Sequence, residues 1–549
     1  MATVTKSIGT SSRDYSTIAA WDADLDNTAI YSSSDTGRGE CYADSAFSQS
    51  GYQRLDGGTT VGLSLIILTV PVGQRHDGTA DSGAKVNLTS GGRFVLWYGS
   101  STWPPRTMEW LELDGGDSDQ NFGSFGFVVG ISTAGQLGTV SHLLLHGCHN
   151  TQVSDGNMYG MIAGSISQPG GIFDNIIYDC SGRLQTPGIG GGSNGVICNN
   201  TVYKIGMTYT SYAGDGSREA IGILCPANCV IKNNIAIGTY FADDGHDHEK
   251  YDYLVSGGGA VGTYNLSGDS TASGSDSITG VSTASLFIST TSGSEDLHIL
   301  RSSSAVGAGD DLGTSVTSGS ATFGGSTYGS PINRDINNGN RDSFSQTWDI
   351  GASQFQIIAK IGTSSRDFST IAAWEAQLDN TDYYGKGSRA TGECYADSDF
   401  SMTGALAIDG GGTVDLIGRT LTVAVGQRHD GTANSGVRLL RTADGSNWIS
   451  MDSSTGANGG PGNQIEWLEV DCNEKNVRTI ISVTSYGGVQ RCLAHSGRWD
   501  GGNQWLMGIT CGKKGWICNN IIYDLYQDNG SSTAEGINAI RAHGGGALD

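Results

Sequence analysis

A long internal repeat constrains the fold of this chain more than any other feature of its sequence. The stretch IGTSSRDYSTIAAWDADLDNT begins at Ile8 and returns as IGTSSRDFSTIAAWEAQLDNT from Ile361, an offset of 361 − 8 = 353 residues. The same offset relates the segment GECYADS around Cys41 to its second occurrence around Cys394. A match of this length without gaps indicates that one structural unit is present twice.

The repeat predicts two domains, a first copy at residues 1–357 and a second copy at residues 358–549. Farther along the chain, IFDNIIYD at 172–179 matches ICNNIIYD at 517–524 with an offset of 517 − 172 = 345. Since 549 − 345 = 204, the second copy corresponds to the first only as far as residue 204. We therefore expect copy two to be incomplete relative to copy one, with its last strand edge covered by further residues or by a neighbouring chain.

The composition favours strands and turns over long helices. Glycine accounts for 85 of the 549 residues and charged residues for only 16%, whereas long helices need many Ala, Leu, Glu, Lys and Arg residues. One short helix is nevertheless predicted near the start of each copy, capped in the first copy by Asp14 or Ser16. The apolar residues that carry this i, i+3, i+7 pattern are Ile18, Trp21 and Leu25 in copy one and Ile371, Trp374 and Leu378 in copy two.

Short apolar runs that have the length of strands follow the predicted helix. In copy one they are 61–70, 107–114, 140–146, 172–178, 196–203 and 229–237. An asparagine stands in the middle of four related runs: Asn175, Asn200, Asn234 and Asn520. Asparagine tolerates left-handed backbone better than other non-glycine residues, and its amide both donates and accepts hydrogen bonds. We expect each of these residues to bend its strand and to bond to the asparagines above and below it, forming a ladder in a stack of coils.

These runs resemble the coils of a right-handed parallel β-helix of the pectin-lyase-like superfamily. The segment RDYSTIAAW resembles the helix with which such domains begin, and INRDINNGNRDSFSQTWDIGA at 332–352 resembles their closing segment. The resemblance implies an all-β fold, a right-handed parallel β-helix duplicated in tandem, with a short N-terminal capping helix on each copy. The combination of GECYADS with GQRHDG is also similar to uncharacterised β-helix proteins of phages.

The octapeptide GQRHDGTA occurs at 73–80 and again at 426–433, and it could be either a repeated active site or a repeated turn. Neighbouring His and Asp side chains point in different directions along an extended segment, which argues against a catalytic pair. Asp-Gly, in contrast, is a strong turn former. We therefore predict a structural turn, with an arginine that bonds carbonyls or Glu40; its residues are Arg75, His76, Asp77, Arg428, His429 and Asp430.

The segment FADDGHDHEKYDY at 241–253 holds the densest group of metal-type ligands in the sequence. The candidate ligands are Asp243, Asp244, His246, Asp247 and His248, and Ca²⁺ is the cation that alternating carboxylates would suit. The alternative is a solvated acidic loop, because no EF-hand or glycine-rich nonapeptide spacing is present. The segment resembles polygalacturonase elements only superficially, because those lie on separate coils.

Charge and hydropathy exclude several classes of function. A net charge of −24 without a Lys/Arg run makes nucleic acid an unsuitable partner. The N-terminus has no apolar segment of the signal-peptide type, and the run LSLIILTV at 63–70 is too short to span a bilayer. Eleven cysteines, mostly without counterparts in the repeat, are interpreted as thiols.

The tryptophans and tyrosines offer two interpretations, sugar stacking on an exposed face or packing within the coils. The residues concerned are Trp97, Tyr98, Trp103, Trp110, Trp448, Trp467, Trp499 and Trp505.

We find no catalytic set of the pectate lyase or pectinesterase type, and this favours a protein without enzymatic activity and without a required cofactor. The sequence therefore predicts a structural protein of a phage virion, made in the host cytoplasm: a capsid decoration, cement or tail fibre component. Its expected partners are other virion proteins or copies of itself, and a cell-surface glycan. The alternatives are a polysaccharide-degrading enzyme, such as a tailspike-like depolymerase with acidic residues in a groove, and a bacterial surface adhesin.

Overall fold

The chain forms two compact units, which are described separately. Unit 1 comprises Met1–Asn337 with Thr347–Phe355, and unit 2 comprises Asn338–Gln346 with Gln356–Asp549. The structure is a computed structural model, and the residues that it describes are 2–96, 104–117, 127–130, 138–149, 160–163, 170–182, 186–207, 219–241, 249–256, 258–272, 274–300, 302–318, 321–324, 331–341, 347–355, 357–381, 383–384, 389–414, 416, 418–445, 447–451, 463–484, 487–500, 505–512, 515–527 and 536–542.

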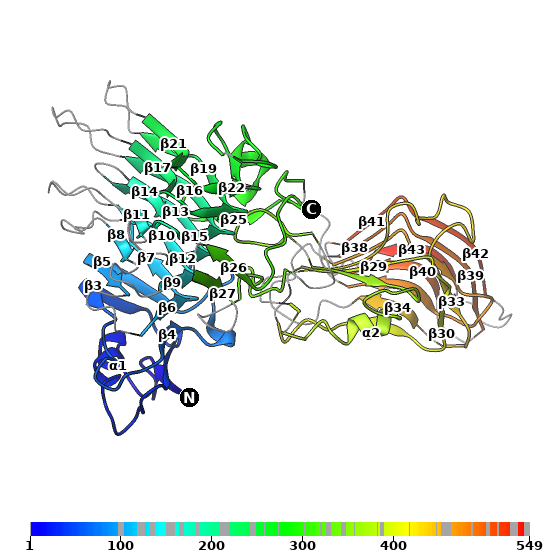
Figure 1. The fold of residues 1–549 in the computed structure, drawn as a ribbon. Helices are drawn as coiled ribbons and strands as arrows, with labels where there is room; N and C mark the ends of the chain where they lie inside the picture. The colour runs from blue at the N-terminus through cyan, green and yellow to red at the C-terminus, as the bar shows by residue number, and fades with distance from the viewer. Residues whose placement is uncertain are drawn as a thin grey trace. The chain divides into compact units, whose positions relative to one another are not determined.

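Unit 1 is a parallel β-solenoid whose coils present three walls (Figure 1). The first wall consists of β1 (Thr3–Ile8), β2 (Thr36–Cys41), β4 (Leu65–Thr69), β6 (Arg106–Glu109), β9 (Gly138–Ser141), β12 (Gly170–Phe173), β15 (Val196–Cys198), β18 (Val230–Lys232) and β22 (Val261–Thr263). The second wall consists of β3 (Phe47–Arg54), the first part of β5 (Lys85–Val95), β7 (Glu112–Asp114), β10 (Leu144–His146), β13 (Ile176–Gly182), β16 (Thr201–Met207), β19 (Ile235–Ile237) and β23 (Leu266–Ser267), with β20 (Tyr240–Phe241) beside β16. The third wall consists of the second part of β5, β8 (Phe127–Gly130), β11 (Gly160–Ala163), β14 (Thr186–Gly190), β17 (Glu219–Cys225) and β21 (Glu249–Val255).

Unit 2 repeats this arrangement in three sheets of parallel strands. The first contains β28 (Ile357–Ile361), β29 (Arg389–Cys394), β32 (Gly418–Val423), β35 (Asn463–Glu466), β38 (Gly487–Gln490) and β41 (Trp516–Cys518). The second contains β30 (Phe400–Met402), β33 (Arg438–Arg441), β36 (Glu469–Asp471), β39 (Leu493–Trp499) and β42 (Ile521–Gln527). The third contains β31 (Leu406–Ile408), β34 (Asn447–Met451), β37 (Thr479–Val483), β40 (Leu506–Cys511) and β43 (Ile537–Ala542). The prediction of an all-β chain folded as a parallel β-helix is confirmed.

Two α-helices occur among the described residues, α1 (Ile18–Asp24) and α2 (Ile371–Glu375). The described residues also form the 3₁₀ turns η1 (Val72–Gln74) and η3 (Thr283–Ser285). The expected cap at Asp14 or Ser16 is wrong: Thr17 is the N-cap of α1, and its hydroxyl accepts a hydrogen bond from the Ala20 amide at 3.1 Å. Asp14 accepts instead from the Ser7 amide, which belongs to β1.

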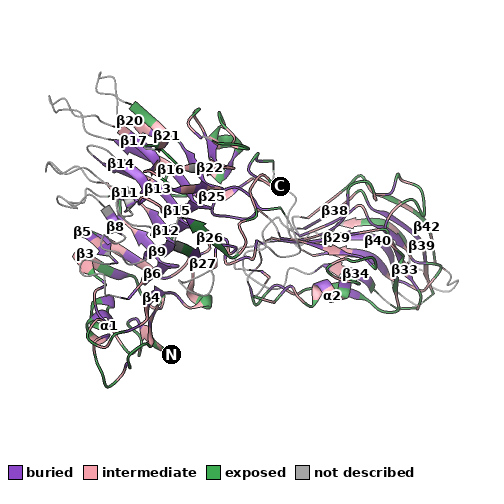
Figure 2. Cartoon of the chain, in the orientation of Figure 1, coloured by how far each residue is buried: buried purple, intermediate pink, exposed green. Residues whose placement is uncertain are grey.

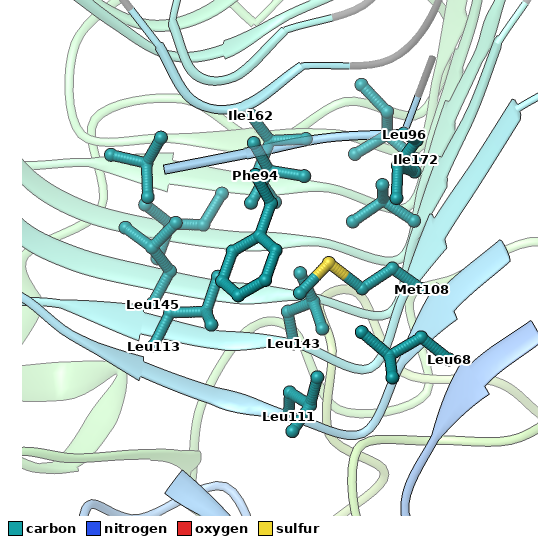
Figure 3. Close-up of a cluster of buried hydrophobic side chains, with 14 of the residues drawn as sticks. Leu68, Phe94, Leu96, Met108, Leu111, Leu113, Leu143, Leu145, Ile162 and Ile172 are labelled. Carbon is teal, nitrogen blue, oxygen red and sulfur yellow. The ribbon is translucent and has the colours of Figure 1, made fainter. Parts of the chain in front are cut away.

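The interior of each solenoid is filled by a continuous column of apolar side chains, which Figure 2 shows as buried residues along the strands. In unit 1, side chains of the first wall such as Leu68 and Met108 meet Leu113 and Leu145 of the second wall (Figure 3). Unit 2 has its own cluster of the same kind. All eleven cysteines are free thiols, and all except Cys518 are buried in these coils. No helix in the described part of the chain combines the length and apolar character that crossing a membrane requires.

The sharp bend between the first and second walls is made by one residue per coil in left-handed backbone. In unit 1 these residues include Trp110 (φ 66°), His142 (φ 53°), Asp174 (φ 58°), Asn199 (φ 55°) and Asn233 (φ 56°). The expectation that the ladder asparagines themselves make the bend is therefore wrong. The bend falls one residue earlier, and each predicted run of copy one except 61–70 contains two strands separated by it.

The asparagine that follows the bend points into the coil and bonds along the stack. The side-chain amide of Asn175 donates to Asn200 Oδ1 at 2.9 Å, and that of Asn200 donates to Asn234 Oδ1 at 2.9 Å. Asn234 continues the ladder to Asn265 at 3.0 Å, a rung not predicted from sequence. In unit 2, Asn520 accepts from the Cys492 amide and donates to the Val489 carbonyl. Asn175 bonds to its preceding coil in the same way, because it accepts from the Leu143 amide and donates to the Val140 carbonyl.

The outer face of the second wall differs between the units. In unit 1, Ile176 and Tyr178 of β13 are buried, because a segment that includes the hairpin β24 (Phe287–Ser289) and β25 (Asp296–Ile299) packs over them. A second antiparallel hairpin in unit 1 pairs β26 (Ser315–Ser318) with β27 (Ala321–Gly324). In unit 2, Ile521 and Tyr523 of β42 occupy the corresponding positions and are 45% and 42% exposed.

Candidate functional site

A cluster of one glutamate, one aspartate and one histidine lies on the outer face of the second wall of unit 1. Glu112 and Asp114 stand two residues apart on β7, so both side chains project from the same face of the strand. The parallel register pairs Asp114 with His146 of β10, which brings the imidazole beside both carboxylates. The ligand atoms of these three side chains all lie within 4.8 Å of one another.

Glu112 orients the histidine ring. Its carboxylate is fully buried, and its Oε1 atom lies 3.0 Å from His146 Nε2. A carboxylate can only accept, so Nε2 carries a proton and donates it, and Nδ1 lies on the side of the ring that faces Asp114. The other glutamate oxygen accepts from the Asp81 amide at 2.9 Å, so both oxygens of this buried group are satisfied.

Asp114 lies on the opposite side of the ring, with Oδ1 3.8 Å from His146 Nδ1. That separation is too long for a hydrogen bond. Burial opposes ionisation of Asp114, but the hydrogen bond from the Gly116 amide and the nearby His146 and Lys85 outweigh it, so the pKa of this carboxyl lies below its ordinary value. Lys85 Nζ contacts Asp114 Oδ2 at 3.1 Å and Asp81 at 2.6 Å.

Unit 2 contains the same cluster at the same register position. His495 Nε2 lies 3.1 Å from Glu469 Oε1, and His495 Nδ1 lies 3.7 Å from Asp471 Oδ1. The second oxygen of Glu469 accepts from the amide of Asn434 at 2.8 Å. The strands that carry the two histidines read VSHLLLH and VQRCLAH, so the histidine is retained although most of its neighbours differ.

An aromatic ring covers each histidine from the next coil. Tyr178 stacks on His146 with ring centroids 5.1 Å apart, and Tyr523 stacks on His495 at 4.9 Å. Stacking fixes the plane of the imidazole, which adds to the orientation that the glutamate provides.

The GQRHDGTA loop borders this cluster and behaves as a turn. Asp77 Oδ1 accepts from the amide and hydroxyl of Thr79, and the Asp77 amide donates to Ser82. Arg75 donates to the Val70 carbonyl at 3.1 Å, and its guanidinium lies over the Trp110 ring. His76 is buried, with Nε2 2.9 Å from the His142 carbonyl.

The second copy of the loop has the same internal bonds. Asp430 accepts from the amide and hydroxyl of Thr432, and these bonds lower the pKa of Asp430 to about 2. Arg428 donates to the Val423 carbonyl at 3.2 Å and lies over Trp467. Burial lowers the pKa of His429. In both units the residue that directly follows the octapeptide, Asp81 or Asn434, donates its backbone amide to the glutamate of the cluster.

A cavity of about 490 Å³ opens beside the cluster of unit 1. Six carboxylate residues line it together with His146: Asp81, Asp114, Asp117, Asp179, Glu295 and Asp296. No Lys or Arg is among the lining residues, although Lys85 pairs with Asp114 and Lys204 pairs with Asp179 at 2.9 Å. The cavity therefore carries a net negative charge and suits a cationic or hydroxyl-rich ligand.

Two of these carboxylates come from the hairpin that covers the second wall of unit 1. Asp296 is 2.6 Å from His298 Nδ1. Glu295 is only 8% exposed, and its Oε1 atom has no hydrogen-bond partner among the described residues. In folded proteins most buried polar atoms have a protein or water partner.

The other residues singled out from sequence lie elsewhere or were not described. Asp243, Asp244, His246, Asp247 and His248 fall outside the described residues, as do Trp97, Tyr98 and Trp103. Trp110 and Trp448 are fully buried, Trp467 and Trp499 are half-buried, and Trp505 is 43% exposed. The cluster itself was missed, although the Glu-x-Asp spacing of 112–114 recurs at 469–471 and could have drawn attention to it.

Comparison with known proteins assigns no family to this chain. No family model matches the sequence, and no curated protein matches it. Among solved structures the chain is similar to the PL6 family alginate lyase AlyGC, at 10% identity over 98% of this chain and 80% of that chain, with a TM-score of 0.17. A mutant of the same enzyme matches at 10% identity over 96% and 80%, with a TM-score of 0.18. The parallel register of the strands in this chain, rather than this similarity, defines the fold.

Proposed function

We propose that this chain is a non-enzymatic structural protein of a phage virion, a capsid decoration, cement or tail fibre-type component. Its β-helix would act as a rigid scaffold for assembly or surface attachment, with other virion proteins or copies of itself as partners. The proposal includes the inference that the two units arose by tandem duplication, which the match between Ile8 and Ile361 supports. It also includes the inference that α1 and α2 cap the solenoids.

The observation that carries this proposal is the apolar surface formed by Ile521 and Tyr523 on unit 2. Both side chains are more than two-fifths exposed, whereas their counterparts Ile176 and Tyr178 in unit 1 are buried under apolar side chains such as Phe287. Adjacent exposed apolar side chains on a flat sheet favour burial against another protein surface. We propose that a neighbouring subunit covers this face in the assembled particle.

The test is incorporation of the chain into particles. We expect mass spectrometry of purified particles to give a fixed ratio of this chain to the other subunits, and Ile521→Lys with Tyr523→Lys to reduce that ratio at least about tenfold, because a buried charge opposes association. Ile288→Lys is the matched control, since Ile288 is also an isoleucine 45% exposed, on β24 of unit 1. Absence of the chain from particles, or equal incorporation of all three proteins, contradicts the proposal.

The acidic cavity favours a second candidate function, a polysaccharide-degrading enzyme. His146, held by Glu112, lies beside Asp114 at the edge of the cavity, and such groups can exchange protons with a bound glycan. A monomeric chain that shortens a polysaccharide, and loses this activity in Asp114→Asn, would support the enzyme. An inactive chain with unchanged particle binding in Asp114→Asn would support the structural protein.

A further inference from the structure

We propose that the second wall of unit 2 binds an antiparallel β-hairpin of a partner protein, one that is apolar on its buried face and carries a histidine beside Asp430. The hairpin of β24 and β25 in unit 1 is the template for this partner. The inference rests on the assembly role proposed above, because it states the chemistry of the partner that covers Ile521 and Tyr523.

The second wall of unit 1 already binds a hairpin of this kind. Four apolar side chains in and next to the hairpin share one buried cluster with Ile176 and Tyr178 of β13. They are Leu286, Phe287, Leu297 and Ile299. The tip of the hairpin, at residues 293–296, lines the cavity beside His146. The outer face of this wall is therefore a binding surface for a hairpin within the chain itself.

The GQRHDGTA loop of unit 1 is part of the same contact. Gly78 is buried with φ 87°, and a Cβ atom at this position would lie 3.1 Å from His298 Cε1. Burial opposes protonation of His298, but the hydrogen-bonded Asp296 and the charge of Asp77 are among the groups that raise its pKa to about 9. The loop thus gives the hairpin a close backbone approach and a carboxylate that complements its histidine.

Unit 2 presents the same loop and wall in a more exposed form. Asp430 is exposed, whereas its counterpart Asp77 is half-buried. A Cβ atom at Gly431 would meet Ile521 Cδ1 at 3.3 Å, a side chain that is itself 45% exposed, rather than a histidine. Asp430 is ionised at neutral pH, because the bonds within its loop lower its pKa to about 2. Unit 2 therefore retains the elements that hold the hairpin in unit 1.

Charge determines which partner suits this face of unit 2. Asp430 and Asp524 are exposed there. Arg438 of β33 is already paired with Asp399 and Asp471. The face therefore favours a cationic side chain, such as a protonated histidine, over an anionic one.

A second copy of this chain is a poorer partner than a different protein. To supply its own hairpin, the second copy would expose Ile176 and Tyr178 on its unit 1 wall, so burying one apolar surface would uncover another. A different protein, with a hairpin that is not already packed, would increase the buried apolar area without such a loss. We therefore assign the partner to a different protein.

The probe for this surface is a fluorescein-labelled, head-to-tail cyclic peptide with the sequence of residues 286–300, LFISTTSGSEDLHIL. We expect fluorescence anisotropy to show saturable binding of one peptide to the full chain. Ile521→Lys with Tyr523→Lys should weaken this binding at least about tenfold, because a buried charge opposes association. Asp430→Asn in the chain and His298→Asn in the peptide should each weaken it about fivefold. The two changes together should weaken it no more than either alone, because both remove the same ion pair.

Asp409→Asn is the matched control for Asp430→Asn, because Asp409 is also an exposed aspartate but follows β31 in the third sheet. This variant should leave the affinity unchanged, and a cyclic peptide of the same residues in scrambled order should not bind. Circular dichroism and the melting temperature of each variant establish that it is folded. Since binding is measured on the isolated chain, a chain that binds the peptide but is absent from particles would contradict only the assembly role.

Three results would overturn the inference of a hairpin partner. The first is the absence of saturable binding of the peptide to the folded chain. The second is binding that the lysine variant and Asp430→Asn leave unchanged. The third is a dimer of the chain in sedimentation that Ile521→Lys with Tyr523→Lys dissociates, because a second copy would then be the partner. A chain that is incorporated into particles despite any of these results would keep the assembly role without this partner.

Discussion

At each corner between the first and second walls, two adjacent residues divide the structural work. The first adopts left-handed backbone and turns the chain, and the second points inward and bonds along the stack, as Asn199 and Asn200 do. The turning position accepts several residue types, including Trp110 and His142, because the surrounding coils hold the backbone in place. The inward position is an asparagine in four successive coils of unit 1, where the amide donates to one neighbouring coil and accepts from another.

We predict that Asn200→Ala lowers the free energy of unfolding by about 3–5 kcal/mol. The change removes the acceptor of the Asn175 backbone and side-chain amides and one donor to the Ile172 carbonyl, whereas the Cys198 carbonyl keeps its bond from the Asp174 amide. Each buried group left unpaired costs about 1–3 kcal/mol. Urea unfolding followed by circular dichroism measures the loss. Asn520 is half-buried and makes two such bonds, so Asn520→Ala should lower the free energy of unfolding clearly less. Equal losses at both positions would show that the bonds between asparagines along the stack do not stabilise the fold.

At the turning position, unlike the inward position, the backbone conformation matters more than the side chain. Asn519 has φ 56° and an exposed side chain, so its backbone conformation is its main contribution. We predict that Asn519→Gly changes stability by less than about 0.5 kcal/mol, whereas Asn519→Ala costs about 1 kcal/mol, because a Cβ atom disfavours left-handed backbone. Comparison of the urea midpoints of the two variants checks this, and an alanine variant as stable as the glycine variant would show that the bend is not strained.

At the scale of elements, the sequence predicted where strands occur. It did not predict the bend that divides a run into two strands, or which strands pair with each other. The Ile-x-Asn-Asn runs indicated where strands occur, because apolar alternation and turn residues are local signals. The repeated Glu-x-Asp spacing marks Glu112 and Asp114 in the sequence, but their proximity to His146 depends on a register between strands 32 or more residues apart. The hairpin that supplies Glu295 was missed for the same reason, since its packing partners lie on distant coils.

That hairpin should make the stability of unit 1 depend on pH. Burial lowers the pKa of His298, but the hydrogen bonds to Asp296 and Asn337 and the nearby charges outweigh it and raise the pKa to about 9. Because the folded pKa exceeds the ordinary value of 6.5, the stabilisation is complete below pH 6.5 and is lost as the pH rises through 9. We predict a fall in unfolding free energy of at most about 3 kcal/mol across this range.

Urea midpoints at pH 6 and pH 9.5 measure this effect, with His298→Asn as the control. The variant should lose most of the difference between the two pH values, because it retains a polar side chain but cannot titrate. A difference of the same size in the variant would assign the pH dependence to other groups.

At the scale of the whole molecule, both units apply the same coil design and bury their sulfur atoms inside it. Ten of the eleven cysteines are buried, and burial raises the pKa of thiols such as Cys492, to about 12. A thiol of this kind is neither ionised at neutral pH nor accessible, so it behaves as a small apolar side chain. Cys518, on β41, is the exposed exception.

Thiol reactivity therefore reports on the integrity of both solenoids at once. We predict that a thiol reagent such as dithionitrobenzoate modifies about one cysteine per native chain at pH 7.5, and all eleven in guanidinium chloride, because unfolding exposes the buried sulfur atoms. Cys518→Ser should remove the fast-reacting thiol and leave the denatured count at ten. Rapid modification of several cysteines in the native chain would show that coils open easily, and the continuous packing described for the two cores would then be wrong.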